Sequence, residues 1–169
     1  SGARFLAQAP AVARGAFLVT PLGFARAQQS ASDNRYMASE PAFDPMIALM
    51  QHAQLARALS SCLPVVSFPG DAETPDALFP NNVFATIPGR AIIGAMRHPV
   101  RRLEARRFDI RTWFRDLLGY SIVDLSDMGC VAELTGAMVI DRARGIGYCG
   151  LSERCDRAGA KAMHEAFGL

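Results

Sequence analysis

A carboxylate and two amides stand close together in a loop bounded by prolines. Asp76 follows Pro75, and Asn81 and Asn82 follow Pro80 just before an apolar run. Polar side chains that a rigid turn holds next to a strand are well placed to line a binding site. The same residue types also satisfy the backbone groups of turns. Composition alone therefore leaves a binding role and a turn role open for these three residues.

Two arginines and a glutamate are the other candidates for a polar site. Arg101 and Arg154 each lie near the start of an expected helix, and Glu133 precedes an expected hairpin. A guanidinium group binds a carboxylate through paired hydrogen bonds. The alternatives are an ion pair of Arg101 with Glu104, a surface ion pair for Arg154, and a turn-capping role for Glu133. Both interpretations stay open at this level.

The cysteines carry no recognisable metal or redox motif. The chain has four cysteines, Cys62, Cys130, Cys149 and Cys155. No two of them form a Cys-x-x-Cys pair, and no His stands at zinc-ligand spacing from any of them. We expect reduced thiols in the cytoplasm, no metal and no cofactor. Cys149 and Cys155 flank Arg154, but no His or acid follows in a suitable arrangement, so neither is assigned as a nucleophile. His164 is expected to be a partly exposed helix residue.

Composition sets the class of the protein. The 169 residues are 50% hydrophobic and 20% charged, with a net charge of +2, as in a single folded α/β domain. This charge is too small for a nucleic-acid partner, although the Arg-rich stretch 97–107 needs a local explanation. No apolar run reaches the roughly 18 to 20 residues of a membrane helix. Residues 16–25 resemble a short signal-peptide core, but Pro21 interrupts them and a first strand is the prediction.

Hydrophobic periodicity predicts an alternation of strands and helices. Gly119 and Gly168 stand where helix-ending glycines are expected. The expected strands are 16–20, 63–68 and 121–125, the expected hairpins are 82–95 and 135–150, and the expected helices are 43–60, 103–118 and 155–167.

The hairpin and the helix that follows it occur twice. With an offset close to 53 residues, Asn82 falls on Thr135 and Arg101 falls on Arg154. A repeat of this length indicates one supersecondary unit used several times. Residue identity between the copies is low, so the shared order of elements carries the inference. The units are expected at about 16–80, 81–133 and 134–169, the third being incomplete, within one domain spanning 1–169.

Four motifs in register resemble one enzyme superfamily. The loop Pro75-Asp76-x-x-Phe79-Pro80-Asn81-Asn82 resembles a motif of citrulline-utilisation hydrolases and the Pro-Asp-x-x-Phe-x-Glu-Asp loop of dimethylarginine dimethylaminohydrolases. The other three motifs are 101–104, 133–136 and 150–154. Over roughly residues 16–169 the chain is similar to the first half of the arginine deiminase and amidinotransferase superfamily. The resemblance implies a ring of five β-β-α-β units, a five-bladed α/β propeller.

The same resemblance implies a chemistry and a set of site residues. In this superfamily a Cys thiolate attacks a guanidino or ureido carbon, and a His handles the leaving amine and the water. By resemblance Asp76, with Asn81 and Asn82 beside it, would face that group, Arg101 and Arg154 would bind the substrate's carboxylate, and Glu133 would add a further acid. No catalytic residue of this chain is assigned, because the family's His and Cys are expected beyond it.

Two consequences follow from departures from the pattern. Asn81-Asn82 stand where methylarginine hydrolases carry Glu-Asp, and amides cannot neutralise a cation, which suggests a neutral ureido substrate. The chain by itself is expected to be inactive and to need a complementary C-terminal segment or a second chain, with homo-oligomer formation through open strand edges. The alternatives are a non-catalytic half-ring that binds an amino acid or assembles with a partner, and an unrelated α/β domain with chance motifs.

Overall fold

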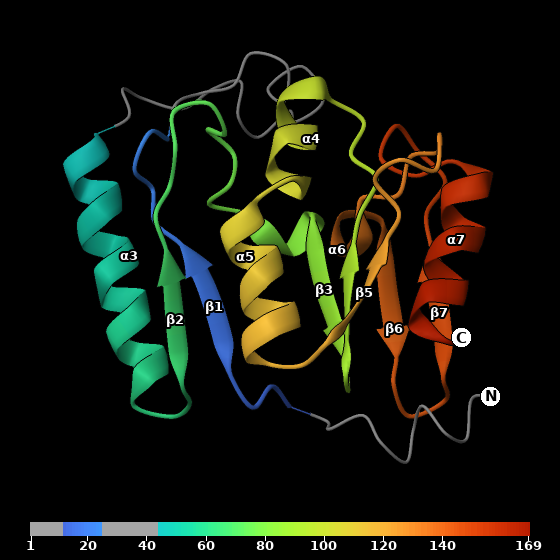
Figure 1. Cartoon of the computed structure of the whole chain (residues 1–169), viewed down its shortest axis with the longest axis horizontal. Coiled ribbons are helices and arrows are strands. Elements are labelled where there is room, and N and C mark those ends of the chain that lie inside the picture. Colours follow the sequence, from blue (N-terminus) through green and yellow to red (C-terminus); the bar gives the residue numbers. More distant parts are fainter. Residues whose placement is uncertain (1–11, 25–43) are drawn as a thin grey trace. The chain divides into compact units, whose positions relative to one another are not determined.

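The computed structural model describes residues 12–24 and 44–169, which fall into two compact units, Val12–Pro80 and Asn81–Leu169 (Figure 1). The polar stretch 26–41 and the expected helix start at Phe43 lie outside the described residues. Within the described ranges, no helix combines the length and apolar character needed to cross a membrane.

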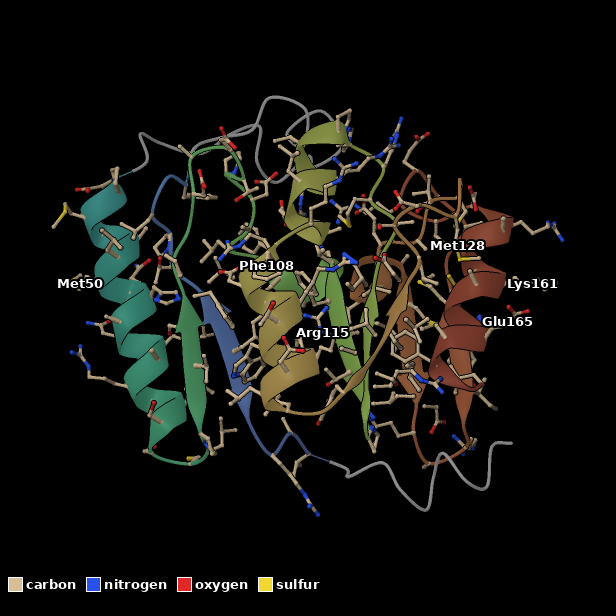
Figure 2. The ribbon with its side chains drawn as sticks, in the orientation of Figure 1. Met50, Phe108, Arg115, Met128, Lys161 and Glu165 are labelled. Carbon is tan, nitrogen blue, oxygen red and sulfur yellow. The ribbon has the colours of Figure 1, made fainter. Side chains whose placement is uncertain are left out.

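Within its described residues, 12–24 and 44–80, the unit Val12–Pro80 is a β-α-β arrangement of two parallel strands and one helix (Figure 1). Strand β1 (Ala16–Val19) pairs with β2 (Val65–Phe68), and helix α3 (Pro45–Ser60) lies between them in sequence. Asp44 caps α3 by accepting hydrogen bonds from the backbone of its first turn. The predicted strands and helix are confirmed for the described residues. No residue of α3 is fully buried, and Met50 points away from the strands (Figure 2).

The unit Asn81–Leu169 begins with a three-stranded mixed sheet of order β3-β4-β5. Strands β3 (Phe84–Ile87) and β4 (Arg90–Ile93) form the predicted antiparallel hairpin, and β5 (Ser121–Asp124) runs parallel to β4. The hairpin turn ends on Gly89, whose φ of 72° lies in the left-handed region that glycine tolerates best. The order β-β-α-β predicted for this segment is confirmed.

The predicted single helix 103–118 is wrong in one respect, because three helical segments connect β4 to β5. They are α4 (Pro99–Ala105), α5 (Phe108–Thr112) and a π-helical segment (Trp113–Leu117). The chain leaves helical geometry at Arg107, whose ψ is 100°. The apolar residues do not form one buried stripe: Ile110 and Phe114 are buried, whereas Phe108 is 74% exposed (Figure 2).

The second hairpin and its helix follow β5. Strands β6 (Met138–Asp141) and β7 (Ile146–Cys149) form a separate two-stranded antiparallel sheet, and α7 (Arg157–Phe167) follows it. The predicted strand 135–140 begins too early, because its first residues belong to the short helix α6 (Leu134–Ala137). Gly168, at φ 74°, ends α7 as predicted. Lys161 and Glu165 lie on the exposed face of α7 (Figure 2).

The repeat is present in element order, but its offset is not constant. Strand β6 begins 54 residues after β3 (Met138 against Phe84), and β7 begins 56 residues after β4 (Ile146 against Arg90). The difference arises because the second turn is longer than the first. The proposed match of Arg101 with Arg154 fails in structural terms, since Arg101 lies on α4 and Arg154 lies in the loop before α7.

The core of this unit joins the sheet residues to α7. Its fully buried members include Ile92, Ala132, Leu134 and Met163. Gly159 lets α7 approach the segment before α6, because a Cβ on it would lie 1.8 Å from the carbonyl oxygen of Val131. This approach sets the position of the residues that follow Val131, which include a candidate site residue.

Candidate functional site

Asp76 lies in the unit Val12–Pro80, on a succession of tight turns. The amide of Ala77 donates to the carbonyl of Thr74, and the amide of Phe79 donates to the carbonyl of Asp76 at 2.9 Å. The side chain of Asp76 is 2% exposed. The sequence prediction of a rigid Pro-bounded loop is confirmed, and a buried carboxylate there must be held by polar partners.

Asn81 and Asn82 begin the unit Asn81–Leu169 and are tied to helix α6. Asn81 Nδ2 donates to the Thr135 hydroxyl at 2.8 Å. The same hydroxyl donates to the backbone carbonyl of Asn81 at 2.9 Å. Asn81 Nδ2 also lies 3.3 Å from Asn82 Oδ1. The two bonds between Asn81 and Thr135 link residues 54 positions apart in the chain. Thr135 therefore positions the two asparagines, a role that sequence analysis did not give it.

Glu133 and Arg154 form an oppositely charged pair in the same unit. Glu133 is buried and accepts a hydrogen bond from the backbone amide of Arg97 at 3.3 Å. Its Oε2 lies 3.9 Å from Arg154 Nε, which is an ion pair but is too long for a hydrogen bond. The amide of Glu133 donates to the carbonyl of Arg154 at 3.1 Å. The backbone and the charges together hold these two residues side by side.

Gly136 is the point at which Asn82 and Arg154 meet. A Cβ built on Gly136 would lie 3.2 Å from Asn82 Oδ1 and 3.6 Å from Arg154 Nη1. Asn81, Asn82, Glu133 and Arg154 thus gather around α6 from three distant parts of the sequence. The motif 133–136 was identified in the sequence, but the place of Gly136 between two other site residues depends on the fold.

The guanidinium of Arg154 has unused capacity to bind an anion. Its side chain is 35% exposed, and among the described residues it makes no hydrogen bond and its ion pair with Glu133 is at 3.9 Å. Guanidinium groups bind carboxylates through two parallel hydrogen bonds. Arg97, which pairs with Glu153, brings a second guanidinium to the loop that carries Arg154. The ion pair of Arg97 with Glu153 thus accounts for one arginine of the Arg-rich stretch 97–107.

Arg101 is engaged in an ion pair on α4. Its Nε donates to Glu104 Oε1 at 2.7 Å and its Nη2 donates to Glu104 Oε2 at 2.9 Å. Both side chains are buried, being 8% and 2% exposed. Removing one partner of such a pair leaves an uncompensated buried charge. The Arg101–Glu104 ion pair, which the sequence offered as the alternative to a substrate-binding role for Arg101, is therefore present.

Cys155 and His164 are not arranged for nucleophilic catalysis. Burial, with Cys149 as the next cause, raises the pKa of Cys155 to about 12, so its thiol stays protonated. Both ring nitrogens of His164 face backbone carbonyls, Nδ1 at 2.7 Å from Ala160 and Nε2 at 2.9 Å from Gly147. His164 joins α7 to β7. No group of three or more His, Cys, Asp or Glu side chains able to hold a metal occurs in residues 12–24 or 44–169.

Comparison with known proteins decides the family. Residues 20–169 match the family model described as eukaryotic N,N dimethylarginine dimethylhydrolase. The chain belongs to the dimethylarginine dimethylhydrolase family. This places it in the arginine deiminase and amidinotransferase superfamily, as the motifs predicted, and excludes the interpretation of chance motifs. No curated protein sequence matches the chain.

Solved structures show the same fold. A mutant dimethylarginine dimethylaminohydrolase from Pseudomonas aeruginosa, complexed with citrulline, has 25% identity and a TM-score of 0.70, with 94% of this chain and 59% of that chain covered. The N-terminal domain of ArgZ, a cyanobacterial arginine dihydrolase bound to its substrate, has 18% identity and a TM-score of 0.72, with 90% and 54% covered. The chain thus spans somewhat more than half the length of these two solved chains.

Proposed function

We propose that this chain supplies substrate-binding residues of a hydrolase. The hydrolase would cleave a carbon–nitrogen bond at the guanidino or ureido carbon of an arginine-like substrate. The observation that carries the proposal is the convergence of Asn82, Glu133 and Arg154 around Gly136. An acid, an amide and a half-exposed guanidinium together complement an amino acid that ends in a ureido or guanidino group. The names of the similar structures, complexed with citrulline or bound to an arginine dihydrolase substrate, support this chemistry.

Each site residue receives a role in this proposal. Arg154 binds the substrate's carboxylate, and Glu133 holds Arg154 while placing a negative charge in the site. Arg101 is assigned to the same carboxylate by resemblance, although its pairing with Glu104 points to a positioning role instead. The role of Asp76, facing the guanidino or ureido group, rests on its motif and on its rigid turn.

We infer that Asn81 and Asn82 favour a neutral ureido group over a guanidinium. Both side chains are amides, and Thr135 fixes Asn81 so that its amide cannot easily rearrange. An amide hydrogen-bonds to a ureido group without leaving a charge unpaired. In the full-length protein, Asn82→Asp should raise the affinity for arginine relative to citrulline, because a carboxylate pairs with the cation. Unchanged relative affinities in titration calorimetry would contradict this specificity.

The catalytic thiol and histidine are proposed to lie outside this chain, in a complementary C-terminal segment or a second chain that closes a ring of five β-β-α-β units. The chain would supply units at about 16–80, 81–133 and 134–169. The element order from β3 to β5, repeated in part from β6 to α7, supports this arrangement. Purified 169-residue chain should then show no hydrolysis of arginine, citrulline or methylarginine, and clear turnover would overturn the assignment.

The central test is ligand binding to the chain as it stands. Arg154→Gln removes the charge while keeping a hydrogen-bonding side chain, and it should weaken citrulline binding roughly 10- to 100-fold, since a charge-assisted hydrogen bond contributes about 1.5–3 kcal/mol. Arg144→Gln is the matched control, because Arg144 pairs with Asp141 at the exposed β6–β7 turn. Equal affinities for the two variants would exclude Arg154 from the site.

A further inference from the structure

Two cysteines lie in contact at the base of the loop that carries Arg154. Cys149 ends β7 and Cys155 stands just before α7, and their sulfur atoms are 3.2 Å apart. Cys155 is fully buried, whereas Cys149 is partly exposed. Cys149 is therefore the more accessible of the two thiols, and Cys155 lies in contact with it. The remaining cysteines differ, since Cys62 is exposed on the other unit and Cys130 makes no sulfur–sulfur contact among the described residues.

The backbone already holds the two thiols in this arrangement. The amide of Ser152 donates to the carbonyl of Cys155 at 3.0 Å, and the amide of Cys155 donates back to the carbonyl of Ser152 at 3.1 Å. The backbone of Cys155 also forms an isolated antiparallel β-bridge with that of Ala132, in the segment that leads to Glu133. The Ser152–Cys155 bonds close the turn from Ser152 to Cys155, and the register of β7 with β6 places Cys149 opposite Met138, so backbone pairing holds each cysteine. A disulfide needs its sulfur atoms to approach from 3.2 Å to about 2.0 Å, a small movement for partly exposed Cys149.

We propose that Cys149 and Cys155 form a reversible regulatory disulfide, with hydrogen peroxide as the oxidant. The Cys149 thiolate attacks one peroxide oxygen, the oxygen–oxygen bond breaks, and the departing hydroxide takes a proton to leave as water. The Cys155 sulfur then attacks the sulfenic sulfur of Cys149, a sulfur–sulfur bond forms, and the sulfur–oxygen bond breaks. The hydroxide released in this step takes the Cys155 proton and leaves as a second water. Two thiols and one peroxide give one disulfide and two waters.

The order of events follows from the environment of each thiol. Burial raises the pKa of Cys155 to about 12, so Cys155 keeps its proton, and its sulfur lies 3.2 Å from the sulfur of the more exposed Cys149. Cys149 is therefore the attacking residue and Cys155 the resolving one. Closing the bond tightens the loop that holds Ser152, Glu153 and Arg154. The oxidised chain should hold the Arg154 guanidinium in a narrower range of positions than the reduced chain.

Mass spectrometry of the full chain treated with hydrogen peroxide tests the proposal. The intact mass should fall by the mass of two hydrogen atoms. Two of the four thiols should no longer react with an alkylating reagent, and reduction with dithiothreitol should restore their reactivity. Trypsin cleaves after Arg144, Arg154 and Arg157, so the peptide 145–154 should appear linked to the peptide 155–157. Linkage through Cys130 or Cys62, or sulfinic acids without this linked pair, would overturn the assignment.

Single substitutions separate the proposed pair from the other cysteines. Cys149→Ser, at a partly exposed position, should abolish the loss of two hydrogen atoms and leave Cys155 alkylatable after denaturation. Cys62→Ser is the matched control and should form the linked peptide like the unmodified chain. Persistence of an intramolecular disulfide in Cys149→Ser would refute the pair. Because the readout is covalent, it is independent of whether the chain binds citrulline or takes part in hydrolysis.

Discussion

Gly159 is the position at which a single methyl group should be most damaging. A Cβ there would stand 1.8 Å from the Val131 carbonyl oxygen, and contacts shorter than 3.0 Å are essentially never seen, so α7 and the Val131 segment must separate by about 1.2 Å. That carbonyl accepts the amide of Asp156 at 3.1 Å, and the movement would also disturb fully buried Ala132 and Met163. Overpacking costs about 1–3 kcal/mol and a lost hydrogen bond about 1 kcal/mol.

The expected loss for Gly159→Ala is therefore about 3 kcal/mol in the free energy of unfolding. With a urea dependence of about 2 kcal/mol per molar, the unfolding midpoint should fall by about 1.5 M. Far-ultraviolet circular dichroism during urea titration measures this shift. Gly150→Ala is the matched control: its Cβ would meet no heavy atom within 4 Å and its φ is not positive, so the change should stay within about 0.5 kcal/mol. Equal midpoints for the two variants would refute the close packing of α7.

Three further predictions concern the same unit. Gly136→Ala places a methyl carbon 3.2 Å from Asn82 Oδ1, so citrulline affinity should fall roughly tenfold with little change in the urea midpoint, and calorimetry showing full affinity would contradict the site. Asp156→Ala removes the acceptor of the Gly159 and Val131 amides at 2.6 and 3.0 Å, which should cost about 1–2 kcal/mol by urea titration, whereas Asp156→Asn should recover only part of that stability, because its one amide oxygen can accept from only one of the two backbone amides. The Arg107 hydrogen bond lowers the pKa of Asp109 below 3.8, so its stabilisation is present above that pH and is lost as pH falls through the lowered value. Because the Asp109 side chain is 40% exposed, Asp109→Asn should cost less than about 1 kcal/mol at pH 7, and a difference that did not shrink as the pH fell further and further below 3.8 would show that another interaction is responsible.

Local chemistry in the sequence was enough to predict most of the elements. Alternating apolar residues around Pro88-Gly89 predict a hairpin, and a glycine after the last apolar residue of a helix predicts its end, as at Gly168. These signals act over a few residues, through backbone dihedrals and near-neighbour hydrogen bonds. The family resemblance likewise rested on short motifs, and the match over residues 20–169 confirms it.

Features that depend on distant packing could not be obtained in the same way. The helix predicted over 103–118 divides at Arg107, and the apolar residues beyond that point do not share one buried face, since Ile110 and Phe114 are buried whereas Phe108 is 74% exposed. Thr135, predicted to begin a strand, lies in α6, where its hydroxyl serves Asn81. Neither outcome is encoded in periodicity, since both depend on which surface the segment meets.

The candidate residues themselves were visible in the sequence, but their grouping was not. Asn82, Glu133 and Arg154 could each be named from type and motif, whereas their convergence on Gly136 and the contact of Cys149 with Cys155 required the three-dimensional arrangement. Residue type determines which protons and charges a side chain can offer. Tertiary packing determines which of those groups come within bonding distance, because hydrogen bonds weaken steeply with distance and angle and the attraction between opposite charges falls as their separation grows.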